Sequence, residues 1–136
     1  MSVFRALVVE DDFVSRKLVS EVLRKDFHCD SASDGLEALE AYNLSVAQAR
    51  PYDVIVLDLS MPRVSGPRAL RLIRDAEEKE GIASGQGVPV LVLTAHRCAF
   101  TAAFRAGCDA YLTKPVRPAI LLAKAKELAG TKRGQK

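Results

Sequence analysis

Long apolar runs are absent from this sequence, and cysteine is scarce. No apolar run approaches the ~20 residues that a membrane-spanning helix requires, and the N-terminus has no signal-peptide pattern. The three cysteines are odd in number and include no C-x-x-C pair, so we expect neither a disulfide framework nor a zinc site. These absences predict a protein of a reducing compartment, the cytoplasm, without membrane contact. The cysteines are Cys29, Cys98 and Cys108.

A strong charge of either sign is also absent, and so are internal repeats. The formal net charge is +3, and much of it lies near the C-terminus in what we interpret as a solvated helix face and a short tail. We therefore expect no direct binding to nucleic acid. A chain of 136 residues can bury one ordinary core, so we expect a single domain over residues 1–130 and a disordered basic tail at 131–136.

What the sequence does contain is a regular alternation of strand-like and helix-like segments. Short apolar runs predict strands that are buried on both faces, and one polar, alternating segment predicts an edge strand. Between them, apolar residues recur at helical spacing. Five strands alternating with five helices predict an α/β fold, with a parallel sheet covered on both faces. The strands are predicted at 6–9, 27–32, 54–57, 89–94 and 110–113, and the helices from 13, 35 and 67, through 99–104, and through 121–128.

The helices carry further signals at their ends and along their faces. Asp12 is placed to cap the first helix, and Asp34 opens a capping box for the second. Helical spacing predicts an apolar face in each of the first three helices. These faces are Val14, Leu18 and Val22 with Val19 and Leu23 in the first helix, Leu36, Leu39, Tyr42 or Asn43, and Val46 in the second, and Leu70, Ile73 and Ala76 in the third. The charged, glycine-rich stretch from Glu77 to Gly87 is predicted to be the most mobile loop.

Polar residues gather at the predicted carboxyl ends of the strands. Glu10 and Asp11 follow the first strand, Asp58 ends the third, Thr94 the fourth, and Lys114 follows the fifth. Parallel strands end at one edge of a sheet, where open α/β sheets bind ligands, so these side chains should meet. Three carboxylates need a cation to offset their repulsion, and a few such oxygen ligands favour Mg²⁺. An aspartate beside a metal ion, a lysine and a hydroxyl is suited to phosphoryl transfer.

Four short motifs occur in order: V-V-E-D-D ending at Asp12, L-D-L-S-M-P from Leu57, L-T-A at 93–95, and Y-L-T-K-P ending at Pro115. Together they resemble a response-regulator receiver domain of two-component signalling, from Arg5 to about Leu128. The resemblance implies a CheY-like, doubly wound sheet of order 2-1-3-4-5 with five helices. It implies a phosphoacceptor, not an enzyme with turnover, that promotes its own phosphorylation and dephosphorylation. The donor would be a histidine kinase or a histidine phosphotransfer protein.

The resemblance assigns the metal and phosphorylation sites residue by residue. Asp58 is the expected phosphoacceptor and a metal ligand. Asp11 is the expected direct Mg²⁺ ligand, and the carbonyl of Ser60 would add another. Glu10 stands where aspartate is commoner in the family, and it would hold the ion through water. Ser60 and His96 occupy two variable positions that tune hydrolysis of the acyl phosphate.

Further roles concern signalling. Thr94 and Lys114 would bind the phosphoryl oxygens, and Tyr111 would turn inward as Thr94 moves, which changes the partner affinity of the surface around it. The Lys114–Pro115 peptide bond is expected to be cis. We expect no output domain in this chain, so a downstream protein of unknown identity would carry the signal. The chain would be a monomer or a phosphorylation-dependent dimer.

Three other classes of protein compete with this interpretation. A phosphatase with an aspartyl nucleophile usually has a second aspartate two residues further on, where this chain has Ser60. A dinucleotide-binding protein would carry G-x-G-x-x-G after the first strand, and the motif is absent. A pseudo-receiver that only binds partners would not need the intact acids, threonine and lysine.

Overall fold

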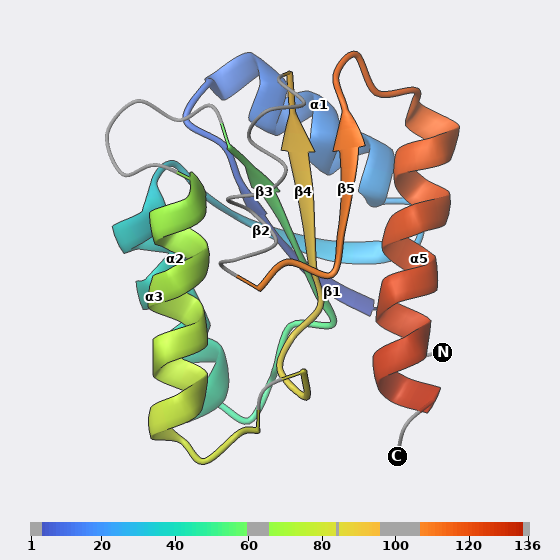
Figure 1. The fold of residues 1–136 in the computed structure, drawn as a ribbon. Coiled ribbons are helices and arrows are strands. Elements are labelled where there is room, and N and C mark those ends of the chain that lie inside the picture. The colour runs from blue at the N-terminus through green and yellow to red at the C-terminus, as the bar shows by residue number, and fades with distance from the viewer. Residues whose placement is uncertain (1–3, 60–65, 84, 96–106, 135–136) are drawn as a thin grey trace.

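The computed structural model describes residues 4–59, 66–83, 85–95 and 107–134 (Figure 1). These residues form five strands and four helices that alternate along most of the chain. In chain order the elements are β1 (Phe4–Val9), α1 (Phe13–Leu23), β2 (Phe27–Ala32), α2 (Gly35–Ala47), β3 (Val54–Asp58), α3 (Gly66–Lys79), β4 (Val90–Thr94), β5 (Ala110–Thr113) and α5 (Pro118–Gly134).

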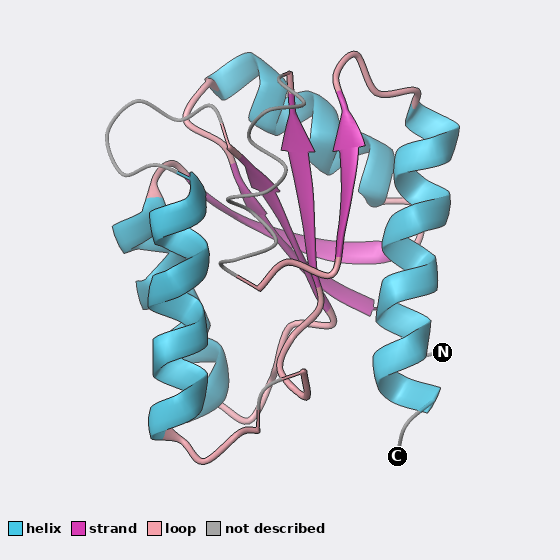
Figure 2. Cartoon of the chain, in the orientation of Figure 1, coloured by secondary structure: helices cyan, strands magenta, loops and turns pink. Residues whose placement is uncertain are grey.

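The five strands form one parallel sheet in the order β2-β1-β3-β4-β5. Figure 2 shows this twisted sheet at the centre of the molecule, between two groups of helices. The predicted fold class and strand order are confirmed, and the polar strand β2 lies at an edge as expected. The helix predicted over 99–104 lies outside the described residues.

Each face of the sheet has its own helices and its own core. Helices α2 and α3 cover one face, and α1 and α5 cover the other (Figure 1). In β1, Leu7 and Val9 pack on the α2–α3 side, whereas Ala6 and Val8 pack on the α1–α5 side. The residues of Val54–Leu57 alternate in the same way. The strands are continuous apolar runs because both of their faces are buried.

The two predicted helix caps are present. The backbone N–H of Ser15 donates to Asp12 Oδ2 at 2.9 Å, so Asp12 caps α1. The backbone N–H of Glu37 donates to Asp34 Oδ1 at 2.9 Å, so Asp34 caps α2. Each cap satisfies an N–H group that has no partner within its helix.

The buried faces of the helices were predicted with mixed success. In α3, Leu70 and Ile73 are fully buried, as the spacing predicts. The prediction for α2 was only partly right. Tyr42 is buried and Leu39 is half-buried, but Leu36 and Val46 are exposed, and Gly35, Ala38 and Ser45 are buried as well. Small residues let α2 approach the sheet closely, and the Tyr42 ring fills the space beside them. In α1, Leu23 is buried and Val19 and Val22 are half-buried as predicted, whereas Val14 and Leu18 are exposed.

The segment from Glu77 to Gly87 differs from the loop that was predicted. Helix α3 continues to Lys79, and the Glu77 side chain is buried. Its carboxylate forms an ion pair with Arg74 at 2.8 Å and accepts the backbone N–H of Val88 at 2.6 Å. A side chain at Gly87 would overlap this carboxylate. The sequence pattern missed this contact because a charged run usually faces solvent, whereas Glu77 has two partners that compensate its burial.

The C-terminal helix extends beyond the predicted domain boundary. Helix α5 runs to Gly134, so residues 131–134 belong to it and not to a separate tail. None of the helices in the described ranges combines the length and the apolar character that crossing a bilayer requires.

Candidate metal centre

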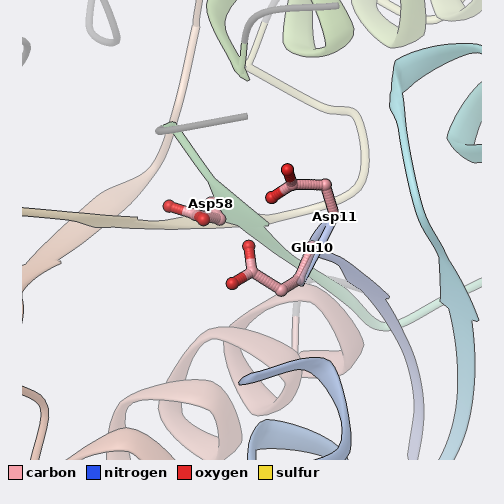
Figure 3. A group of neighbouring side chains, drawn as sticks. All are labelled: Glu10, Asp11 and Asp58. Carbon is pink, nitrogen blue, oxygen red and sulfur yellow. The ribbon is translucent and has the colours of Figure 1, made fainter. Parts of the chain in front are cut away.

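Three carboxylates meet where two neighbouring strands end. Strands β1 and β3 pair with Val9 beside Leu57, so Glu10 and Asp58 follow at adjacent places on the same edge. One oxygen each of Glu10, Asp11 and Asp58 lie within 4.8 Å of one another. Figure 3 shows the three carboxyl groups gathered beside the end of β3. The predicted convergence of these acids is therefore present in the structure.

Burial of the cluster makes the negative charge costly. Glu10 and Asp58 are each only 5% exposed, whereas Asp11 is exposed. Burial raises the pKa of Glu10 to about 8, and the hydrogen bond and negative charge of Asp58 add to that rise. The Lys114 ammonium opposes it. Without a further cation, the protonated form of Glu10 is favoured at neutral pH.

Lys114 supplies the positive charge on one side of Asp58. Its Nζ lies 3.1 Å from Asp58 Oδ1 and 4.0 Å from Glu10 Oε1. The backbone positions it, because the N–H of Lys114 donates to the carbonyl of Thr94 at 2.8 Å. The peptide bond between Lys114 and Pro115 is cis, as predicted.

Thr94 and Tyr111 lie on the two strands beside this cluster. Asp58 pairs with Leu93 across β3 and β4, so Thr94 is the next residue along that edge, and it is buried. Tyr111 is on β5, where it pairs with Val92, and it is 36% exposed. Of the other predicted positions, Ser60 and His96 lie outside the described residues.

The donor set fits a hard divalent cation. Glu10 Oε2 is buried and has no hydrogen-bond partner, so a buried oxygen remains to be satisfied. Three carboxylates with a single nearby ammonium leave the described cluster negative. Oxygen-only ligands of this kind suit Mg²⁺, which binds a few carboxylates and keeps several waters.

The sequence reasoning missed one residue that supports the cluster. Arg16 Nη1 donates to the backbone carbonyl of Glu10 at 2.8 Å, and the backbone N–H of Arg16 donates to the carbonyl of Asp12 at 2.9 Å. Arg16 therefore spans the turn that carries the first two acids. In the sequence, Arg16 is marked only by its place one turn after the Asp12 cap, and an arginine there usually faces solvent.

The fold and this acidic edge together define a CheY-like α/β domain. The family model of the response regulator receiver domain matches residues 6–126. This chain belongs to the response regulator receiver domain family, and it is a phosphoacceptor domain of two-component signalling.

Proteins with known roles contain the same domain. The chain is 35% identical over 120 residues to the hybrid signal transduction histidine kinase I of Dictyostelium discoideum, covering 86% of this chain and 7% of that kinase. The receiver domain of the Pseudomonas aeruginosa sensor histidine kinase PA1611, which has a magnesium ion coordinated in its active site cleft, matches with a TM-score of 0.76 at 28% identity, covering 95% of this chain and 99% of that chain. A co-crystal structure of the Saccharomyces cerevisiae phosphotransfer protein Ypd1 with the receiver domain of Ssk1 matches with a TM-score of 0.79 at 29% identity, covering 96% of this chain and 91% of that chain.

Proposed function

We propose that Asp58 accepts a phosphoryl group from a phosphohistidine donor in a Mg²⁺-dependent reaction. The observation that carries this proposal is the grouping of Asp58 with two further carboxylates and the Lys114 ammonium, 3.1 Å away, at one edge of the sheet. Phosphoryl transfer depends mainly on positioning and on neutralising the oxygens of the transferred group. This edge supplies both.

The proposed step begins at the Asp58 carboxylate. One of its oxygens forms a bond to phosphorus while the bond from phosphorus to the donor imidazole nitrogen breaks, and the electron pair of that bond stays on the nitrogen. Lys114 is placed to balance negative charge on the oxygens that surround Asp58. Thr94, at the end of β4, would add a hydroxyl donor to the same oxygens.

The metal would be held by Glu10, Asp11, Asp58 and the carbonyl of Ser60. Bound there, Mg²⁺ would supply positive charge for the oxygens of the transferring group. The protein residues hold the acids in place. Arg16 fixes the carbonyl of Glu10 through the 2.8 Å hydrogen bond. The known magnesium site in the similar receiver domain of PA1611 supports this assignment.

Signalling would follow from a change at Thr94 and Tyr111. The half-exposed Tyr111 ring would turn inward once Thr94 moves toward the phosphoryl group, and the surface around β5 and α5 would then change its affinity for a partner. The same site would promote hydrolysis of the acyl phosphate. A downstream protein in the cytoplasm would receive the signal, with this chain as a monomer or a phosphorylation-dependent dimer.

The donor is proposed to be a protein, either a histidine kinase or a histidine phosphotransfer protein. Helix α1 begins beside the acids and exposes Phe13 by 66%, Val14 by 62% and Leu18 by 59%. Exposed apolar side chains of this size are typical of protein interaction surfaces. The similarity to a hybrid histidine kinase and to a complex containing Ypd1 supports such a donor.

The test is phosphorylation by a small donor followed by intact mass measurement. With Mg²⁺ and acetyl phosphate, we expect one added phosphoryl group, which Asp58→Asn abolishes. Asp75→Asn, an exposed acid on α3, is the matched control and should still accept the group. Catalytic turnover of a phosphate monoester would instead favour the phosphatase. The absence of any adduct would favour the pseudo-receiver.

A further inference from the structure

Arg16, in the first turn of α1, contacts the segment that carries two of the three acids. Its Nη1 donates to the backbone carbonyl of Glu10, six residues earlier in the chain, at 2.8 Å. That carbonyl belongs to the peptide unit that joins Glu10 to Asp11, and a peptide unit is planar. The orientation of the carbonyl therefore sets the ψ angle of Glu10 and the φ angle of Asp11. A side chain that holds this carbonyl helps to determine where both carboxylates point.

The sheet holds the other side of Glu10. The backbone N–H of Glu10 donates to the carbonyl of Ala32, the last residue of β2, at 3.0 Å. Strand β1 and its pairing with β2 end at Val9 and Ala32, so the chain beyond this bond is held by contacts outside the sheet. The bond from Arg16 to the Glu10 carbonyl is such a contact. The sheet and Arg16 thus fix the two peptide units on either side of the Glu10 side chain.

Asp11 depends most on this arrangement. Glu10 is 5% exposed, so neighbouring side chains restrict it, whereas Asp11 is exposed and has fewer packing contacts. Figure 3 shows the carboxyl groups of Glu10 and Asp11 directed toward Asp58. One oxygen of each acid lies within 4.8 Å of the others. Because an exposed side chain is free to rotate, the backbone of this turn has to supply the direction of Asp11.

Arg16 is itself held in place by α1. Its backbone N–H donates to the carbonyl of Asp12 at 2.9 Å, which is the first hydrogen bond of the helix. Asp12 caps the same helix through the N–H of Ser15. The guanidinium carbon of Arg16 lies 5.6 Å from the centre of the Phe13 ring, which is within cation–π range. The Glu10 carbonyl is therefore anchored to a regular, capped helix.

We propose that Arg16 is a positioning residue that sets the preference of the acidic cluster for Mg²⁺ over the larger Ca²⁺. This inference rests on the proposed function, which assigns a metal to Glu10, Asp11 and Asp58. Mg²⁺ requires short bonds in near-ideal octahedral geometry, whereas Ca²⁺ accepts longer bonds and irregular geometry. Carboxylates held by a fixed turn favour the smaller ion. When the turn loosens, the affinity for Mg²⁺ falls more than the affinity for Ca²⁺.

The charge of Arg16 would have the opposite effect on metal binding. A cation close to the acids repels a divalent ion, so removing the charge alone strengthens Mg²⁺ binding. Removing the hydrogen bond to the Glu10 carbonyl weakens Mg²⁺ binding, because the turn can then rotate. The two roles of Arg16 therefore differ in the sign of the change in Kd, and a measurement separates them.

The test compares the affinities of Mg²⁺ and Ca²⁺ for the full chain, measured by NMR from amide chemical shifts and without any phosphodonor. Arg16→Met removes the guanidinium and keeps an unbranched side chain with good helix propensity. We expect its Mg²⁺ Kd to rise about ten-fold, as is typical when a residue that orients a metal ligand is lost. The Ca²⁺ Kd should rise about three-fold or less, so the ratio of the two affinities changes.

Three control variants separate position from charge and from stability. Arg16→Lys keeps a cation and a donor, and it should recover most of the Mg²⁺ affinity because the contact uses a single nitrogen. Lys17→Met removes an exposed cation from the same helix and should leave the Mg²⁺ Kd unchanged or slightly lower. Glu77→Gln breaks a buried ion pair at the opposite end of the sheet and should keep both affinities.

The possible outcomes distinguish this inference from the proposed function. An unchanged or lower Mg²⁺ Kd in Arg16→Met, or an equal loss of affinity for both ions, would overturn the role of Arg16. A parent chain that binds neither ion would refute the metal assignment itself, and this result appears before any variant is made. Urea unfolding verifies that the variants are folded, and Arg16→Gln replaces Arg16→Met if the latter does not fold.

Discussion

The buried Glu10 predicts an unusual dependence of stability on pH in the metal-free protein. The pKa of Glu10 rises from 4.5 to about 8 on folding, mainly because the carboxyl group is buried and then because Asp58 lies beside it. A raised folded-state pKa means that the folded protein binds more protons than the unfolded chain between these values. Stability is therefore fully present below about pH 4.5 and is lost as the pH rises toward about 8.

The size of the loss follows from the two pKa values. At ~1.4 kcal/mol per pKa unit, an isolated group of this kind would cost about 3 kcal/mol between about pH 5 and about pH 7.5. Local relaxation and water penetration reduce the cost of burying a charge in real proteins, so we expect about 2 kcal/mol. This is a large fraction of the stability of a domain.

The assay is urea unfolding in EDTA across that range, with Glu10→Gln as the comparison. The amide cannot ionise, so this variant should lose its pH dependence and gain stability at the alkaline end. Glu78→Gln, which replaces an exposed acid, should keep the parent slope. Groups shared by all three proteins cancel in the differences between them. If the difference in the free energy of unfolding between Glu10→Gln and the parent stays constant from about pH 5 to about pH 7.5, the reasoning is refuted.

Three further predictions concern single residues. Lys114→Met should tighten Mg²⁺ binding a few-fold by calorimetry, because it removes the cation beside Asp58; weaker binding would contradict this. Glu77→Gln should cost about 2 kcal/mol in urea unfolding, since it breaks a buried ion pair with Arg74, and an effect no larger than that of Glu78→Gln would count against it. Asp12→Ala should lower the Tm by a few degrees through loss of the α1 cap and leave Mg²⁺ affinity unchanged; an altered affinity would make Asp12 a ligand.

The sheet and the position of the acids could both be predicted from the apolar runs. An apolar run such as Val54–Leu57 has to lie in the interior of a parallel sheet, and the residue after it therefore falls on the edge where ligands bind. Placing Asp58 next to Glu10 required only that β1 and β3 be neighbours, which the family resemblance implied. The position of Lys114 near Asp58 could be predicted in the same way, because Lys114 follows the end of β5.

The faces of α1 and α2 could be predicted only in part, because apolar residues occur all around these helices. In α2, the spacing that starts from Leu36 competes with the spacing that starts from Ala38. Periodicity cannot choose between them, since the choice depends on which residues let the helix approach the sheet. The partners of Glu77 were missed for a related reason: burial of a charge depends on distant residues such as Val88 that local patterns do not connect.

The buried acids Glu10 and Asp58 destabilise the metal-free fold, and the same negative charge favours the binding of a cation. Lys114 offsets part of the negative charge but leaves one buried oxygen of Glu10 without a partner. A second lysine or an amide in place of Glu10 would stabilise the metal-free fold, as the pH argument implies. It would also remove the excess negative charge that attracts a cation. A cation that binds these acids therefore stabilises the folded protein, and it binds because the acids are otherwise destabilising.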